Sequence, residues 1–237
     1  MLRKYSIFED VMILPPEWDD ARREWEDKYE SAVSYMESRP RSGRVLLEIA
    51  AQHPLVNGLY PNKEFAARLR LGIELYQHHV HDQADVEIYV PGSRHVFDGV
   101  ADKVSLSSAG IAYLIQNGIP AAVLHGDDLN ARYKAEDGVY NSADECFVAA
   151  SYFKNSNFET LASVVSPGQL IRKTLHYIAF GVIPLTYTAP VKLAFHGYMD
   201  ELFTEIPFVL LVDATLQDPG SEKAERLRQE RRPKEST

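Results

Sequence analysis

The chain has little of the residues that mark several large classes of protein. Its 237 residues include one cysteine, Cys146, so no intrachain disulfide can form and nothing indicates an oxidising compartment. Its formal net charge is −9, whereas non-specific nucleic-acid binding needs clustered cations, so we expect no nucleic-acid partner. The apolar run "IPFVLLVDA" is too short to cross a bilayer, and the opening "MLRKYSIFEDVMILPPEWDD" has no long apolar core. We therefore expect a soluble, cytoplasmic protein with neither a signal peptide nor a membrane anchor.

Familiar catalytic motifs are also missing. The sequence contains no Walker loop, no GxGxxG and no GxSxG motif, and no Ser-His-Asp set can be assigned. Histidines gather in "QHHVHDQAD", where His78, His81 and Asp82 would share a face of a continuing helix. This segment precedes a strand, at the end of the sheet away from the expected site, so we assign no metal to it.

What the sequence does have is an alternation of strand-like segments and amphipathic helices. Apolar runs and period-two alternation predict five strands, at 44–51, 86–90, 120–125, 160–166 and 182–189. Helical periodicity predicts four helices between them, at 63–79, 105–118, 142–155 and 167–181. Asn62 is a plausible N-cap, Gly118 a C-cap, and the polar stretch 126–141 a long loop. This order is typical of an open parallel sheet with helices on both faces.

Composition divides the chain into four parts. The α/β core is expected over 41–190, preceded by a helical extension over 1–40 and followed by further helices over 191–218. Residues 219–237 have no apolar face, so we expect a disordered tail.

Polar residues follow the predicted strands at their carboxyl ends, where ligands bind in such sheets. The candidate ligand-binding residues offer hydrogen bonds or positive charge there: Asn57, Gly92, Ser93, Arg94, Asn141, Ser142, Ser166, Gln169 and Arg172. The candidate acids and bases are His95, His125, Asp127, Asp128 and Glu145. His53 also follows a strand. For each of these histidines, the alternative is a hydrogen-bonded structural role.

Three segments have a physical reason to hold an anion. "PGSRH" offers the N–H groups of Gly92 and Ser93 beside the cationic Arg94, which is the pattern of a small anion nest. "YNSADECF" begins a helix with Ser142 and, three residues later, a Glu, which predicts a capping box; free N–H groups there can alternatively hold a phosphate. "SPGQLIRKT" places Arg172 in the second turn of a helix, where it can reach a bidentate anion or form a surface salt bridge.

Several segments, taken together and in order, resemble the SanA/ElyC/YdcF-like family over about residues 44–189. The resembling segments are "NGLYPNKEFAARLRLGIELY", "VEIYVPGS", "YLIQNGIP", "VYNSADECFVAASYF" and "VVSPGQLIRKTLHYIAFGV". The family's helix rich in Arg and Leu matches Arg68, Arg70 and Leu75-Tyr76, and its "SGG"-like loop matches Pro91-Gly92-Ser93. Its acidic residue and "NT-x-E-N"-like helix start match Asp127 or Asp128 and then Asn141, Ser142 and Glu145. Its "TS-x-YH-x-x-RA"-like start matches Val165, Ser166, Gln169 and Arg172.

The sequence departs from the family pattern at several points. Ser93 stands where the family has a second loop glycine, and Gly168-Gln169 where it has a Tyr-His pair. An expected Glu is absent near Leu106, and the stretch 126–140 is longer than usual. The resemblance implies a Rossmann-like fold, a link to bacterial envelope and carrier-lipid metabolism, and the binding of nucleotide-like small molecules. It implies no single reaction, because none is settled for the family.

Two functions follow from these patterns. The first is an enzyme, for example a transferase or hydrolase in a bacterial biosynthetic pathway, acting on a small anionic substrate that is phosphorylated, nucleotide-like or sugar-like. The second is a binding module without chemistry, holding a nucleotide-type ligand such as S-adenosylmethionine. A third reading is an interaction protein, a homo-oligomer for example, that uses a helix carrying Trp18 and Trp25 together with the C-terminal helices.

Overall fold

The computed structural model describes residues 43–97, 100–134, 138–191, 222 and 226. The extension expected over 1–40 therefore lies outside the described residues. So do nearly all of the helices expected over 191–218 and of the tail expected over 219–237.

The centre of the fold is a parallel sheet of five strands in the order β5-β2-β1-β6-β7. The strands are β1 (Arg44–Ile49), β2 (Asp85–Tyr89), β5 (Leu124–His125), β6 (Thr160–Val165) and β7 (Leu185–Thr188). From β1 the chain proceeds outward to β2 and β5, then returns past β1 to form β6 and β7 on its other side. The strand order therefore switches direction between β1 and β6, which is the place where open α/β sheets bind ligands.

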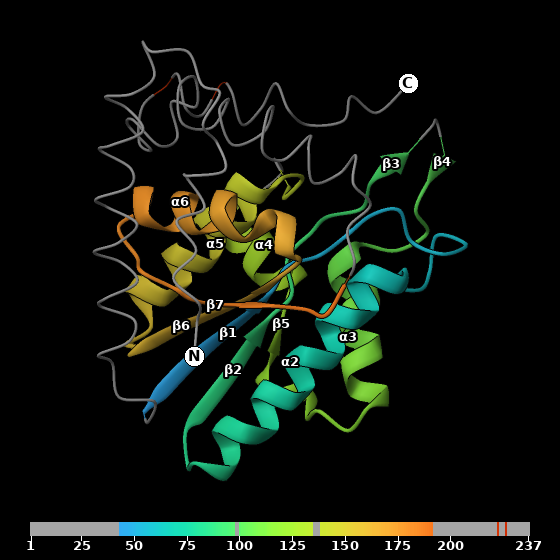
Figure 1. Cartoon of the computed structure of the whole chain (residues 1–237). Helices are drawn as coiled ribbons and strands as arrows, with labels where there is room; N and C mark the ends of the chain where they lie inside the picture. The colour runs from blue at the N-terminus through green and yellow to red at the C-terminus, as the bar shows by residue number, and fades with distance from the viewer. Residues whose placement is uncertain (1–42, 98–99, 135–137, 192–221, 223–225, 227–237) are drawn as a thin grey trace, which may run out of the picture.

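Helices cover both faces of this sheet (Figure 1). One face carries α2 (Lys63–His81) and α3 (Leu106–Gln116), and the other carries α4 (Asp127–Lys134), α5 (Ser142–Asn155) and α6 (Leu170–Ala179). Alternate residues of β1 face alternate layers: Val45 and Leu47 pack with α2 and α3, whereas Leu46 packs with α5. The expected α/β, Rossmann-like open sheet is thus confirmed.

Local signals explain where the helices begin and end. The Asn62 side chain accepts a hydrogen bond from the Phe65 N–H at 2.9 Å, so it caps α2 as predicted. Ser105 caps α3 in the same way, and Gly118 follows that helix with φ +87°, a conformation that glycine adopts without strain.

The chain between α3 and α5 differs from the prediction. Only Leu124 and His125 of the strand expected over 120–125 pair with β2, because a 3-10 turn (Ala121–Val123) occupies the preceding residues. The expected loop over 126–141 contains the helix α4. Its first turn carries Asp127 and Asp128 and its last turn Arg132 and Lys134, so its charges complement the helix dipole. A short hairpin, β3 (Val96–Phe97) with β4 (Val100–Ala101), was not expected.

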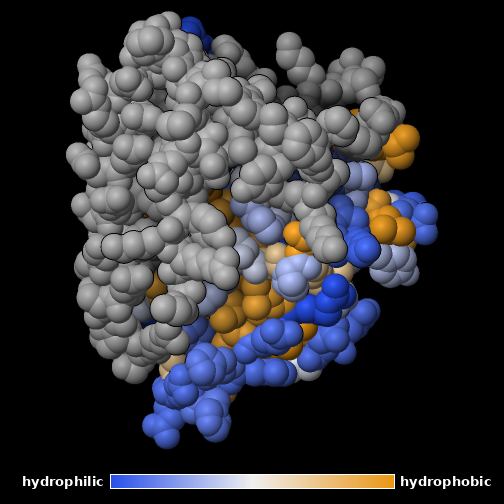
Figure 2. All heavy atoms as spheres, in the orientation of Figure 1, coloured by the Kyte–Doolittle hydropathy of each residue, from blue (hydrophilic) through white to orange (hydrophobic). Residues whose placement is uncertain are grey.

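The histidine-rich end of α2 lies at the opposite edge of the sheet from the switch point. His78 Nε2 lies 3.4 Å from an Asp82 carboxylate oxygen, and His79 is buried. Figure 2 shows a hydrophilic surface at this tip. No cluster of His, Cys, Asp or Glu that could hold a metal occurs among the described residues, and no helix there could span a membrane.

Candidate functional site

The switch point between β1 and β6 gathers loops and helix starts from both layers. β1 leads into Gln52 and His53, and β6 leads into Ser166 and the 3-10 turn Pro167–Gln169 before α6. The start of α5, capped by Asn141, completes the edge. We call this edge of the sheet the crevice, after the position at which open α/β sheets bind ligands, and its residues are described below.

Arg68 of α2 holds the two strand ends together from one face of the sheet. Its side chain is fully buried. The guanidinium donates to the carbonyl of Ala51 at 2.7 Å, to Gln52 Oε1 at 2.9 Å and to Ser166 Oγ at 2.8 Å. Glu64, one turn earlier, lies 2.6 Å from Arg68 Nη2. Burial lowers the pKa of Arg68 although Glu64 opposes the shift. The guanidinium is thus a structural clamp, and its charge is already neutralised.

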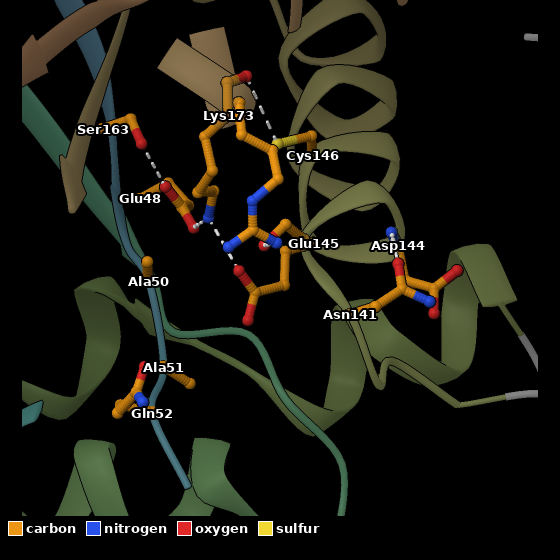
Figure 3. Close-up of polar contacts among 12 residues, drawn as sticks. Glu48, Ala50, Ala51, Gln52, Asn141, Asp144, Glu145, Cys146, Ser163 and Lys173 are labelled. Carbon is orange, nitrogen blue, oxygen red and sulfur yellow. Dashed lines mark hydrogen bonds and ion pairs between the residues drawn. The ribbon is translucent and has the colours of Figure 1, made fainter. Parts of the chain in front are cut away.

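A buried ionic cluster occupies the other face (Figure 3). Lys173 Nζ of α6 lies 2.5 Å from Glu48 of β1 and 2.7 Å from Glu145 of α5, and Ser163 Oγ also donates to Glu48. Burial raises the pKa of Glu48. Burial alone would lower the pKa of Lys173, but the carboxylates of Glu145 and Glu48 raise it above its ordinary value. The lysine charge is therefore shared between two carboxylates and is not available to a ligand.

The start of α5 differs from the predicted capping box. Asn141, not Ser142, is the N-cap, and its Oδ1 accepts a hydrogen bond from the Asp144 N–H at 3.0 Å. Ser142 is the first helical residue and accepts from Arg172 Nη1 at 3.1 Å. Glu145 cannot complete a capping box because its carboxylate faces Lys173. The shift by one residue follows from Asn141 being as good a cap as serine.

Hydrogen-bond donors converge at this helix start. The Asn141 Nδ2 atom is buried and has no hydrogen-bond partner among the described residues. Arg172 is half-buried, and its Nη1 donates to the hydroxyl of Ser142, the residue that follows Asn141. The first N–H groups of a 14-residue helix add a partial positive charge. An acceptor or an anion is the ligand that such a set would take.

The loop after β2 is closed by contacts with a distant segment. Ser93 donates its N–H to the Val139 carbonyl at 2.9 Å, and its Oγ accepts from the Val139 N–H at 2.8 Å. The Gly92 carbonyl accepts from the Ser107 N–H at 3.0 Å. The Ser93 N–H is therefore engaged within the fold, and the anion nest at Gly92 and Ser93 stays a prediction that would need its donors from elsewhere on the loop. Arg94 is exposed on this loop.

Two histidines that follow β1 and β2 meet beside the start of α5. The rings of His53 and His95 stack at 4.8 Å between centroids. His95 is buried, with Nδ1 2.9 Å from the Ser93 carbonyl and Nε2 3.3 Å from the Tyr140 carbonyl. His53 is exposed. Desolvation, and then repulsion from His95, lowers the pKa of His53. Of these two rings, His53 is the one that a ligand can reach.

His125, predicted as an acid or base, belongs to a different network. Its Nε2 lies 2.9 Å from Glu87 of β2 and its Nδ1 3.1 Å from Asp128. Burial alone would raise the pKa of Glu87, but hydrogen bonds from Tyr152 and Arg44 lower it. This network fastens the edge strand β5 to β2 and to α5.

The two aspartates that follow His125 also make contacts within the fold. Asp127 accepts from Ser105 Oγ at 2.6 Å and Ser108 Oγ at 2.9 Å, which joins the starts of α3 and α4. Asp128 accepts from the Gly126 N–H at 2.6 Å. Burial would raise the pKa of Asp128, but the bonds from Gly126 and His125 lower it. Among the described residues, no hydrogen bond joins either aspartate to Asn141.

The remaining predicted ligand residues differ in their exposure and in their contacts within the fold. Asn57 is exposed in a turn with φ +56°. Ser166 is buried between Arg68 and Glu64. Gln169 is half-buried, and its Oε1 atom is buried without a partner in the described part of the chain.

Sequence reasoning named Arg68 only as part of the family resemblance, and it did not single out Lys173. Arg68 lies three positions after the buried Phe65, and Lys173 lies four positions before the buried Tyr177, so each shares a helix face with a buried apolar side chain. A basic residue on the apolar side of an amphipathic helix is the signal that would have found both, since such a charge is buried only when it is paired.

Comparison of the sequence with protein-family models and with curated proteins, and of the structure with solved structures, finds no match. The resemblance to the SanA/ElyC/YdcF-like family therefore rests on its motifs alone.

Proposed function

We propose that this protein is an enzyme that acts on a small anionic substrate bound in the crevice. The substrate is of the phosphorylated, nucleotide-like or sugar-like class. The observation that supports this proposal is the convergence of the buried Asn141 Nδ2, the start of α5 and Arg172 at the topological switch point.

The energetic argument starts from the Asn141 amide. A buried donor without a partner costs about 1–3 kcal/mol, and a ligand oxygen would recover this free energy. Asn141 is held in place because its Oδ1 caps α5, so the direction of its Nδ2 is fixed. The helix start and the Arg172 guanidinium both favour a negatively charged oxygen over a neutral one. Arg94, exposed on the neighbouring loop, adds positive charge for a ligand that approaches from solvent.

A specific observation favours the second candidate, a binding module for a nucleotide-type ligand such as S-adenosylmethionine. Three of the predicted acids and bases, His125, Asp127 and Asp128, are engaged in contacts that join elements of the fold. A binding module would need the donors at α5 but none of these groups as a catalyst.

The first test is thermal stability against a panel of inorganic phosphate, nucleotides, sugar phosphates and S-adenosylmethionine. A ligand at about 100 times its dissociation constant should raise the free energy of unfolding by roughly 2.7 kcal/mol. We expect Arg172→Ala to lose this stabilisation and Arg70→Ala, an exposed arginine of α2, to keep it. Equal stabilisation of both variants would contradict binding at the crevice.

Turnover separates the two candidates. Any compound that stabilises the wild type is incubated with it, and products are followed by mass spectrometry. Conversion that Arg172→Ala abolishes supports the enzyme. Tight binding with no conversion supports the binding module.

A further inference from the structure

We propose that His53 is the proton-accepting side chain of the crevice and that His95 positions its ring. This inference rests on the proposed function, because it assigns a role beside the same ligand. The sequence noted His53 only as a histidine that follows a strand, with a hydrogen-bonded structural role as the alternative.

The backbone on each side of His53 is held by α2. The carbonyl of Gln52, the preceding residue, accepts from Asn62 Nδ2 at 3.4 Å, and the Gln52 Oε1 accepts from the buried Arg68 at 2.9 Å. Pro54, the following residue, accepts at its carbonyl from Asn62 Nδ2 at 3.0 Å. Asn62 is itself fixed as the N-cap of α2. The position of His53 relative to the sheet edge is therefore fixed by the helix and not by the loop alone.

His95 fixes the orientation of the ring. The two imidazoles are nearly parallel, with an interplanar angle of 17°. His95 cannot turn away easily because its two nitrogens face the carbonyls of Ser93 and Tyr140, and the Tyr140 ring lies edge-on at 5.3 Å. Tyr140 precedes the cap of α5, so the same contacts connect His53 with the proposed anion site.

Within the described part of the chain, three segments carry charges that act on His53. His95 on the β2 loop disfavours the protonated His53 ring, and Asp102 before α3 and Glu145 on α5 favour it. Desolvation is the largest effect, and the net result is a lowered pKa. This direction favours the neutral ring over the imidazolium, and the neutral ring is the form that accepts a proton. Asp102 is buried, with its Oδ2 unpartnered in the described part of the chain, and it would stabilise the imidazolium once formed.

The chemical step is a proton transfer. The O–H bond of a water or a substrate hydroxyl breaks, and the proton goes to a nitrogen of His53. The oxygen keeps the electron pair and forms a bond to the electrophilic atom of the bound substrate, whose leaving group departs with its own bonding pair.

The test is the titration of His53 in the full chain, followed by NMR of the imidazole ring and assigned with His53→Gln. We expect a midpoint below the ordinary value of about 6.5. His95→Gln should move the midpoint upward by removing repulsion. Asp102→Asn should move it downward by removing attraction. Asp82→Asn, a matched control at the far end of α2, should leave it in place. A wild-type midpoint at or above about 6.5 overturns the proposal.

Two further readings separate this proposal from the proposed function. The first reading is the carbethoxylation of His53 by diethyl pyrocarbonate, measured by mass spectrometry. Its rate should reach half its maximum at the pH of the NMR midpoint. A His53 that does not react, or reacts only at higher pH, counts against an accessible base. Inorganic phosphate should raise the His53 midpoint in the wild type and less in Arg172→Ala. If the His53 midpoint is low but phosphate does not move it, the result supports the role of His53. The same result contradicts the anion site of the proposed function.

Discussion

Lys173 and Gly92 illustrate what decides the role of a single residue in this protein. Lys173 is fully buried, yet it is charged because two carboxylates lie within 2.7 Å of its Nζ. Gly92 has φ +105°, and an added Cβ would lie 2.8 Å from the Leu106 Cβ. In both cases the residue type is required by neighbours that are distant in the sequence.

Replacing Lys173 should destabilise the fold strongly. Lys173→Met leaves Glu48 and Glu145 buried without a counter-ion, and breaking a buried ion pair in this way costs about 3–5 kcal/mol. Urea unfolding measures the loss. Lys63→Met, at an exposed position of α2, is the control and should change stability by no more than about 0.5 kcal/mol. Adding Glu48→Gln to Lys173→Met should recover part of the loss, and an additive loss would contradict the pairing.

A glycine pair tests the close approach at the β2 loop. Gly118→Ala has φ +87° but nothing within 4 Å of the new Cβ, so it should cost about 1–2 kcal/mol for the backbone alone. Gly92→Ala adds overlap with Leu106 and Ala51, which should cost about 1–3 kcal/mol more. Thermal or urea unfolding of the two variants gives the difference. Equal losses would mean that the loop and α3 can move apart.

Whole elements are joined at the switch point by Arg68. Its guanidinium contacts the segments after β1 and β6 from a position on α2, so three elements depend on one planar group. The backbone hydrogen bonds between β1 and β6 end near Ala51 and Ser166. The Arg68 side chain supplies hydrogen bonds to both segments beyond that point. The shape of the crevice is therefore set by a helix residue.

Lysine should not replace arginine here. Arg68→Lys keeps the charge but lacks the planar fork, so the carbonyl of Ala51 and the Ser166 hydroxyl cannot both be satisfied. We expect a loss of about 1–3 kcal/mol in unfolding free energy for each buried acceptor left unsatisfied, and faster amide exchange at 50–52 and 166–168. Arg70→Lys, exposed on the same helix, should leave both measurements unchanged. Exchange that accelerates equally over all of α2 would point to helix damage rather than a lost clamp.

The whole molecule should respond to pH through carboxyl groups that act in opposite directions. The pKa of Glu48 is raised, so its folded state binds a proton more tightly than the unfolded chain does. Its contribution to stability is fully present below the ordinary value of 4.5 and is lost as pH rises through the raised pKa. The pKa of Glu87 is lowered, so its contribution is present above 4.5 and is lost as pH falls through the lowered pKa.

Two variants separate these windows. Relative to Glu48→Gln, the wild type should gain stability as pH falls from about 7 towards about 4.5. Relative to Glu87→Gln, it should lose its advantage as pH falls below about 4.5. Urea unfolding across this range provides both differences. Parallel curves for wild type and Glu87→Gln below that pH would contradict the stabilising network around His125.

The fold could be predicted from the sequence better than the site could, because strands and helices depend on local patterns and the site depends on tertiary contacts. The strand at 44–51 and the helices at 63–79 and 142–155 were predicted because apolar periodicity is a local property. The helix α4 was not predicted because its residues are mostly polar, as loop residues are. Acidic residues in its first turn and basic residues in its last turn are typical of a helix, and this pattern was not used. Asn141 and Arg172 were predicted at the edge, and the structure brings both to the start of α5. Asp127, Asp128 and His125 were predicted at the same edge and instead join elements of the fold, because a polar loop residue can face a neighbouring helix as readily as a ligand.

The sequence by itself determined the alternation of strands and helices, the cap at Asn62, the low cysteine content and the acidic net charge. Each of these depends on residues within a few positions of one another or on composition. The tertiary structure alone decided that Arg68 ties β1 to β6, that Lys173 lies between Glu48 and Glu145, and that His53 stacks on His95. These partners are between 16 and 125 positions apart where hydrogen bonds join them. Such pairs are formed by the order of the strands, which brings distant loops to one edge, and that order is a property of the packed sheet.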